Sequence, residues 1–302
     1  MEMRFTSRGD GRAEHGYRGR ARAIGRRLKA NAASAYELIG RRGRASRTCR
    51  HPFRAGRRFE DFLGIALLLV GFAAVFLDPF SVEFRRTLTP EIARTFRSIT
   101  DLGKSDWILI PTGLFCIFLM ALDWTRLNRR MTAALSTLVI YVGYVFTSVA
   151  ASGIVVIALK VLCGRARPKY YDQLGAFDFS PFTTDAGYAS FPSGHATTIF
   201  ALVTAGFFIF RRARLLLFAI AFWSAVSRFI IGAHYPSDLA MGMLIGISFS
   251  YWLARQMAVR RLGFRIDRGD GSIKPLHTRW PLVAGRELVH IARERWRALR
   301  PF

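Results

Sequence analysis

Residues 191–210, FPSGHATTIFALVTAGFFIF, decide the fold, because they join a short polar motif directly to a long apolar run. Ser193 and Gly194 suit a helix start, since a serine side chain can cap the first backbone amides. The residues that follow carry no charge and are long enough to cross a bilayer core when flanking side chains reach the headgroups. The sequence therefore places an ionisable imidazole, that of His195, at the N-terminal end of a predicted membrane helix.

Apolar stretches of similar character recur along the chain. They are residues 62–77, 107–122, 131–159, 194–210, 215–231 and 238–254. None alternates in the manner of a β-strand, so each is interpreted as a helix. The expected fold is all-α, an integral membrane bundle of six transmembrane helices over residues 61–258. Thr89 and Pro90 also predict a short helix between the first two spans, lying at the outer surface.

The positive charge of the chain is segregated from its apolar runs. Residues 1–60 hold 17 Lys and Arg against five Asp and Glu, and residues 255–302 hold 12 against four, within a total net charge of +25. Basic loops at 126–130, 211–214 and 255–261 fall on the same side as both tails if there are six spans. Basic segments that flank apolar spans mark the cytoplasmic side. We therefore expect a multi-pass plasma (inner) membrane protein with cytoplasmic termini and no nucleic-acid partner.

The two tails lie outside the predicted membrane domain. Residues 1–60 are expected to form an Arg-rich, partly disordered cytoplasmic tail. Residues 259–302 form a basic tail, in which 282–299 has helical apolar spacing. That segment either lies on an anionic membrane surface or is solvated. The three cysteines are too few and too widely spaced for a disulfide framework or a zinc site.

Three polar clusters reach the side opposite the basic loops, which is the outer (periplasmic or extracellular) face. They are KVLCGRARP (160–168), PSGH (192–195) and SRFIIGAHYPSD (227–238). Taken singly, most have a structural explanation: Lys160 and Arg167 fit membrane anchors, and Ser193 fits a helix cap. Arg228 is different, because it lies inside an apolar span, where an ionisable residue suggests function.

Taken together, the clusters have the composition of a site for phosphoryl transfer. Lys160, Arg167 and Arg228 would neutralise the phosphate oxygens, the arginines through forked hydrogen bonds. The backbone amides around Ser193 and Gly194, at a helix N-terminus, would add donors aligned with the helix dipole. Charge that develops on the transferring group would then meet preorganised donors.

The remaining residues supply a nucleophile, an orienting group and a proton carrier. His234 and Asp238 are four residues apart with Pro236 between them, so we expect both side chains on one helix face. Asp238 would accept a proton from one ring nitrogen of His234, and the other nitrogen would attack phosphorus. His195 would protonate the leaving oxygen and then activate water to clear a phosphohistidine.

These motifs are similar to the signature of the phosphatidic acid phosphatase type 2 superfamily. The signature combines Lys160 with Arg167 and Pro168, then the run 192–195, then Ser227 and Arg228 with His234 and Asp238, all in the same order and spacing. ITDLGKSDW (99–107) also resembles a segment of its membrane members. The resemblance implies a lipid phosphatase that needs no metal or cofactor. It implies that His234 is the nucleophile, His195 the acid and base, and Asp238 the orienting group. Lys160, Arg167, Arg228, Ser193 and Gly194 would bind the phosphate.

Two other functions remain open at this point. One is a vanadium-dependent haloperoxidase-like enzyme, and the other is a non-enzymatic membrane protein that binds phospholipid. The expected partners are a lipid phosphate substrate and membrane lipids. The sequence leaves open whether that substrate is undecaprenyl diphosphate, phosphatidic acid, phosphatidylglycerol phosphate or a lipid A phosphate, and it leaves the oligomeric state open.

Overall fold

The computed structural model describes residues 17–48, 55–127, 129–267, 269, 271–276 and 289. Within them the chain is mostly helical, with a long irregular segment between α6 and α8. The helices are α1 (Tyr17–Thr48), α2 (Ala55–Phe72), α3 (Asp78–Arg86), α4 (Pro90–Ile99), α5 (Asp106–Ala121), α6 (Arg129–Cys163), α7 (Tyr171–Leu174), α8 (Gly194–Ile209), α9 (Arg214–Ile230) and α10 (Pro236–Val259). Strands β1 (Phe264–Ile266) and β2 (Ile273–Pro275) pair as an antiparallel hairpin.

The predicted membrane helices are present, and the all-α prediction is confirmed. Among the described residues, five helical stretches are long and apolar enough to cross a bilayer: Glu60–Arg86, Pro90–Ala121, Met131–Cys163, Arg211–Ile230 and Pro236–Val259. Helix α8 is apolar but has only 16 residues, which is about 24 Å of helix. The chain is a multi-pass membrane protein; the count of six spans and the identity of the outer face stay predictions.

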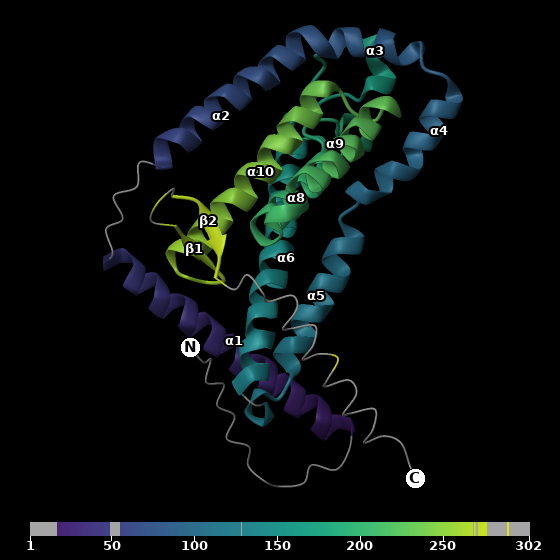
Figure 1. The fold of residues 1–302 in the computed structure, drawn as a ribbon. Coiled ribbons are helices and arrows are strands. Elements are labelled where there is room, and N and C mark those ends of the chain that lie inside the picture. Colours follow the sequence, from purple (N-terminus) through teal and green to yellow (C-terminus); the bar gives the residue numbers. More distant parts are fainter. Residues whose placement is uncertain are drawn as a thin grey trace.

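Helix α8 lies at the centre of the bundle, in contact with α6, α9 and α10 (Figure 1). Most of its residues from Ala196 to Ala205 are buried. A helix that is apolar on every side is typical of a protein core or a membrane span, and the burial of α8 places it among other helices. Neighbouring helices therefore enclose α8 over most of its length, and its N-terminus is held in a fixed place.

Two glycines on α10 set its close approach to α8. A Cβ atom at Gly242 would lie 2.5 Å from the Ser193 carbonyl oxygen, and one at Gly246 would lie 2.5 Å from the Thr197 carbonyl oxygen. Small residues four apart let membrane helices approach to backbone contact. Because the first contact is with Ser193 itself, the same packing positions the polar motif at the start of α8.

We expect Gly246→Ala to destabilise the protein, since the neighbours of the added methyl group are backbone atoms of α8 that cannot move aside. Overpacking of this kind costs about 1–3 kcal/mol. The measurement is the melting temperature of the purified protein in detergent. The matched control is Gly153→Ala in α6, where a Cβ would meet nothing within 4 Å. Equal melting temperatures for the two variants would contradict this account of the helix contact.

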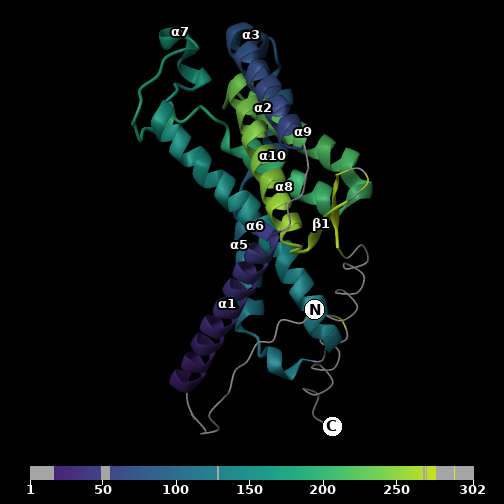
Figure 2. The same cartoon turned by 90° about the vertical axis from the view of Figure 1, so that its left-hand side faces the viewer.

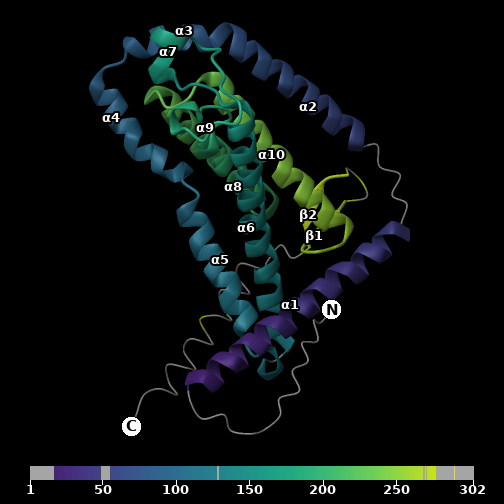
Figure 3. The same ribbon diagram turned by 180° about the vertical axis from the view of Figure 1, so that it is seen from behind.

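The first span is longer than the predicted 62–77. Helix α2 runs through a π-helical turn, Ala73–Leu77, into α3, so the helical stretch reaches Arg86. Asp78, the charge at which the sequence prediction ended the span, is fully buried. Helices α2 and α4 stand on either side of the central group (Figures 1 and 3). Helix α4 begins at Pro90 after Thr89, as predicted, but it belongs to the apolar helical stretch Pro90–Ala121, and its place at the outer surface stays a prediction.

At the other end of the bundle, α1 crosses the ends of α5 and α6, far from α3 and α7 (Figure 2). The Asn31 amide donates to the carbonyl oxygens of Met120 and Leu122, at 2.6 and 3.3 Å. Arg27 pairs with Asp123 at 3.1 Å. Neither this helix nor the hairpin was predicted from the sequence. The amphipathic segment 282–299 lies outside the described residues except for Val289.

Candidate active site

The three predicted clusters meet at one end of the bundle. Lys160 lies in the last turn of α6, His195 in the first turn of α8, and Arg228 in the last turn of α9. His234 lies just before α10, and Asp238 in its first turn. The neighbourhood of these helix ends is visible in Figure 3. His195 and His234 therefore occupy the same end of the bundle, close enough for their charges to interact.

A tight turn at Gly164 brings the first cluster back over the site. Gly164 has a φ of +58° and its amide donates to the Lys160 carbonyl oxygen, which ends α6. A Cβ atom there would lie 1.8 Å from the Ser180 carbonyl oxygen, so only glycine fits. After this turn the chain runs back across the end of the bundle, which places Arg165 and Arg167 beside α10 and α9.

The three predicted phosphate-binding cations converge, and two of them have unused donors. Lys160, Arg167 and Arg228 lie near enough for their charges to interact. The Nε atoms of Arg167 and Arg228 are buried, yet neither finds a hydrogen-bond acceptor within the described part of the chain. Buried guanidinium donors are normally paired. Two unpaired ones beside a third cation, whose ammonium donates to the Ala189 carbonyl oxygen, fit a site for an oxyanion.

Ser193 and Gly194 hold the N-terminus of α8 against α10. Ser193 is fully buried and is the N-cap of α8, with its hydroxyl accepting from the Ala196 amide at 3.5 Å. Its own amide donates to the Asp238 carbonyl oxygen at 3.0 Å. The first amides of a helix have no acceptor within the helix and carry the positive end of its dipole. This end of α8 therefore presents donors to an anion beside His195.

His234 is held through one ring nitrogen. Its Nδ1 atom lies 2.8 Å from the Ser190 carbonyl oxygen and 3.6 Å from Oδ2 of Asp238. The direct hydrogen bond thus goes to Ser190, with the Asp238 carboxylate alongside. His234 also precedes α10 and is not on the helix face that the spacing suggested. A proton on Nδ1 leaves Nε2 with a free lone pair.

Burial sets the protonation state of His234, which is only 4% exposed. Desolvation lowers its pKa from 6.5 to about 4, and the nearby Asp238 carboxylate opposes this shift without cancelling it. The imidazole is therefore neutral at pH 7. A neutral ring with Nδ1 donating has the form required of a nitrogen nucleophile.

Asp238 is the centre of a fully buried polar network. Its Oδ2 accepts from the Ser190 hydroxyl at 2.6 Å and from the Tyr235 amide at 2.9 Å. Its Oδ1 accepts from Nη1 of Arg165 at 2.7 Å. Every one of these donors stabilises the ionised carboxylate, so a fixed negative charge lies next to the imidazole of His234.

Arg165 is a buried residue of the polar network around Asp238 that was not predicted from the sequence. It is 2% exposed and bridges Asp238 to Asp78 of α3, with its Nη2 atom 2.8 Å from Oδ2 of Asp78. It also donates to the Ala176 carbonyl oxygen and lies over the Tyr235 ring, 4.3 Å from the centroid. The signature spacing selected Arg167, which precedes Pro168, and no sequence signal marked Arg165 two positions earlier in the same basic run.

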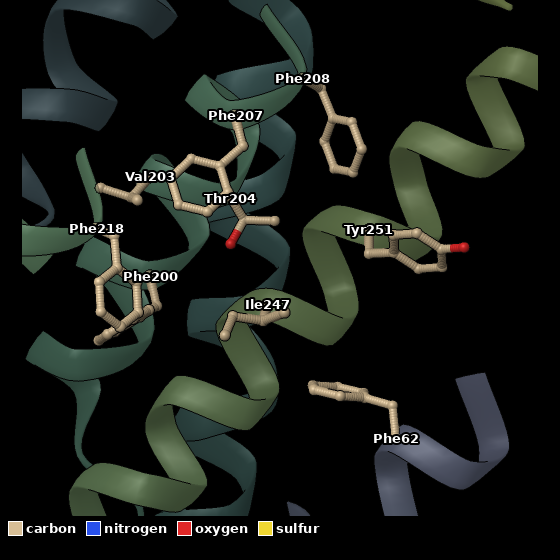
Figure 4. Close-up of a pocket in the computed structure, with 9 residues that line it drawn as sticks. All are labelled: Phe62, Phe200, Val203, Thr204, Phe207, Phe208, Phe218, Ile247 and Tyr251. Carbon is tan, nitrogen blue, oxygen red and sulfur yellow. The ribbon is translucent and has the colours of Figure 1, made fainter. Parts of the chain in front are cut away.

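The apolar cavity in Figure 4 is not part of this cluster. It encloses about 410 Å³ between the middle of α8, α9, α10 and Phe62 of α2. Its lining is apolar except for the hydroxyl groups of Thr204 and Tyr251. No charged side chain lines it, so it cannot stabilise a phosphate. Among the described residues, no group of three or more His, Cys, Asp or Glu has the arrangement of a metal site.

Comparisons with known proteins identify the family. The family model described as "PAP2 superfamily" matches residues 140–262. The chain is 34% identical over 228 residues to a protein named lipid A 1-phosphatase from Rhizobium etli, covering 75% of this chain and 93% of that protein. It is 36% identical over 186 residues to a lipid A 1-phosphatase from Rhizobium johnstonii, covering 61% of this chain and 72% of that protein. Among solved structures, the crystal structure of Aquifex aeolicus LpxE aligns with a TM-score of 0.41 at 21% identity, over 58% of this chain and 93% of that one.

Proposed function

The chain belongs to the PAP2 superfamily, and from this premise we propose that it hydrolyses a lipid phosphate ester through a phosphohistidine. The observation that carries the proposal is the pair of buried Nε donors on Arg167 and Arg228, unpaired among the described residues, near a neutral imidazole. These groups provide an anion site and a nucleophile within the matched region 140–262.

In the first step, Lys160, Arg167 and Arg228 bind the phosphate oxygens together with the amides at the start of α8. Nε2 of His234 attacks phosphorus, and the bond from phosphorus to the ester oxygen breaks. His195 takes up a proton when the anionic phosphate binds beside it and gives that proton to the leaving oxygen, so the lipid departs as an alcohol. The negative charge of Asp238 stabilises the His234 ring as it becomes positively charged.

In the second step, His195 takes a proton from water, and the hydroxide attacks the phosphohistidine. The bond from phosphorus to Nε2 breaks, and inorganic phosphate leaves. The three cations that bound the substrate also stabilise the charge of each transition state. No metal ion is needed in this scheme, because fixed side chains provide the positive charge.

We further propose that the substrate is lipid A carrying a phosphate on its 1-position. The support is the activity named for the Rhizobium relatives, of which one is covered over 93% of its length. We place the site at the outer face of the inner membrane with both termini in the cytoplasm, because the basic loops and α1 lie at the opposite end.

The test is phosphate release by the purified protein in detergent micelles. The panel contains lipid A 1-phosphate, phosphatidic acid, phosphatidylglycerol phosphate and undecaprenyl diphosphate. We expect release from lipid A, unchanged by a chelator such as EDTA. Phosphate release from another lipid but not from lipid A would overturn the assignment of the substrate. No phosphate release from any of the four lipids would overturn the phosphatase proposal.

The pH dependence of kcat/KM provides a further prediction. His234 must be neutral to attack, and its pKa of about 4 means that protonation disables it only when the pH falls through that value. We expect the midpoint of the acid limb of kcat/KM to lie well below pH 6.5. An ordinary histidine would place that midpoint at about 6.5. The substrate phosphate also ionises near pH 6, so its pKa is measured on the free lipid and the kcat/KM profile is corrected for it. A limb that remains at 6.5 after this correction contradicts a neutral, buried nucleophile.

A further inference from the structure

The turn Thr100–Gly103 connects α4 to α5 and touches the site from a side that none of the three clusters occupies. It is a short 3₁₀ turn held by the Lys104 amide, which donates to the Asp101 carbonyl oxygen at 3.1 Å. The Trp107 ring nitrogen donates to the Leu102 carbonyl oxygen at the same distance. These local bonds fix the shape of the turn. The turn is therefore held by its own hydrogen bonds, and α4, which precedes it, stands at the edge of the bundle.

Thr100 holds Arg228. Thr100 is 5% exposed, and its Oγ1 atom accepts from Nη1 of Arg228 at 3.1 Å. The bond uses one donor of the guanidinium and fixes the plane of the group. The Nε donor stays buried without an acceptor among the described residues. Thr100 therefore orients Arg228 without consuming the donor that would meet a phosphate oxygen.

Gly103 lies directly against His195. A Cβ atom at Gly103 would be 2.9 Å from Cβ, 3.0 Å from Cδ2 and 3.2 Å from Cγ of His195. Real Cβ atoms do not approach a neighbour this closely, so a side chain at 103 would displace the ring or the turn. The φ of Gly103 is not positive, which means that glycine is required here for space and not for backbone freedom.

We propose that the turn Thr100–Gly103 is a positioning element for the reaction, in which Thr100 orients Arg228 toward the phosphate and Gly103 sets the place of the His195 ring. This inference rests on the proposed function, and it assigns different duties to the two residues. Loss of the Thr100 hydroxyl weakens anion binding, whereas a methyl group at 103 disturbs proton transfer. Asp101 and Lys104, paired at 2.8 Å, are close enough to act on His195 electrostatically.

The first experiment compares Thr100→Val with Thr100→Ser. Valine has the shape of threonine without the hydroxyl, and serine keeps the hydroxyl. Hydrogen bonds to charged groups typically make a difference of about tenfold or more. We expect Thr100→Val to raise KM, and to weaken orthovanadate binding measured by calorimetry, by about tenfold. Thr100→Ser, which keeps the hydroxyl, should have a KM and an orthovanadate affinity close to those of the wild type. The matched control is Thr95→Val, which removes a hydroxyl bonded only to the Glu91 carbonyl oxygen in α4.

The second experiment is Gly103→Ala, with Gly153→Ala as control. We expect kcat to fall about tenfold or more, since displacement of a catalytic group by an ångström has effects of this size. Orthovanadate affinity should stay within about twofold of wild type, because the anion is held by other residues. If Gly103→Ala does not fold, the double variant with His195→Gly should, since the three nearest atoms all belong to His195.

The outcomes separate this inference from the function on which it rests. One outcome is that the wild type turns over lipid phosphate while Thr100→Val and Gly103→Ala match their controls in KM, kcat and vanadate affinity. This outcome overturns the positioning role and leaves the phosphatase proposal intact. Absence of wild-type turnover, with vanadate binding that Thr100→Val weakens, overturns the phosphatase but supports the role of Thr100. Absence of both turnover and vanadate binding overturns the two together.

Discussion

Replacing His234 with alanine is expected to lower phosphate release by about 10⁴-fold or more, because removal of a nucleophile leaves only binding and charge stabilisation. Nε2 of this residue is the atom proposed to bond to phosphorus. Initial rates of phosphate release with the lipid substrate provide the measurement. The affinity for inorganic phosphate should be largely retained, since Lys160, Arg167 and Arg228 remain in place to bind the anion.

Two further observations separate a nucleophile from a residue that only shapes the site. Added imidazole should restore part of the rate of His234→Ala, because it can enter the vacated space and attack in place of the side chain. Quenching the wild type in alkali during turnover should retain labelled phosphate on His234. Near wild-type activity in His234→Ala would contradict the phosphohistidine mechanism.

Replacing Arg165 with methionine has the second largest expected effect. The change leaves the buried carboxylates of Asp78 and Asp238 without their shared counter-charge. Breaking a buried ion pair by removing one partner costs about 3–5 kcal/mol. We expect a large fall in melting temperature in detergent, together with loss of activity, because Asp238 then no longer holds its place beside His234.

The control for this variant is Arg86→Met, which removes exposed ion pairs with Glu83 and Asp172. Exposed pairs contribute little, so its melting temperature should stay close to wild type. Adding Asp78→Asn to Arg165→Met should recover stability in part, since one unpaired charge is removed. A stable and fully active Arg165→Met protein would show that the network has no role in the site.

The sequence predicted candidate site residues chiefly where several polar clusters were expected on one face. Arg228 within an apolar span conflicts by itself with a purely structural role, whereas His195 and His234 gained a functional interpretation only in combination with the other clusters. The structure brings them to one end of the bundle. The long apolar runs likewise predicted the membrane helices, because burial in lipid needs a continuous apolar stretch.

Other residues near the site have contacts that depend on geometry and not on residue type. Thr100 and Gly103 lie in ITDLGKSDW, a segment that the sequence marked only by resemblance and without a role. These two residues and Ser190 contact Arg228, His195 and His234 across a large sequence separation. Asp78 resembled the charged boundary of a span, and its burial depends on Arg165. Helix α1 has no continuous apolar face, and it is placed by polar contacts such as that of Asn31 with the end of α5. Such pairings cannot be derived from local patterns.

The bridge made by Arg165 also constrains the order in which the protein can be assembled during synthesis. Asp78 leaves the ribosome 87 residues before Arg165, and Asp238 follows 73 residues later. The arginine can meet its first carboxylate while the chain is half made, but its second exists only when α10 begins. A nascent chain that has reached α9 therefore holds an incomplete ionic junction. Insertion of α10 completes the junction and, in the same event, creates the surroundings of His234, so the reactive centre cannot form before that helix is made.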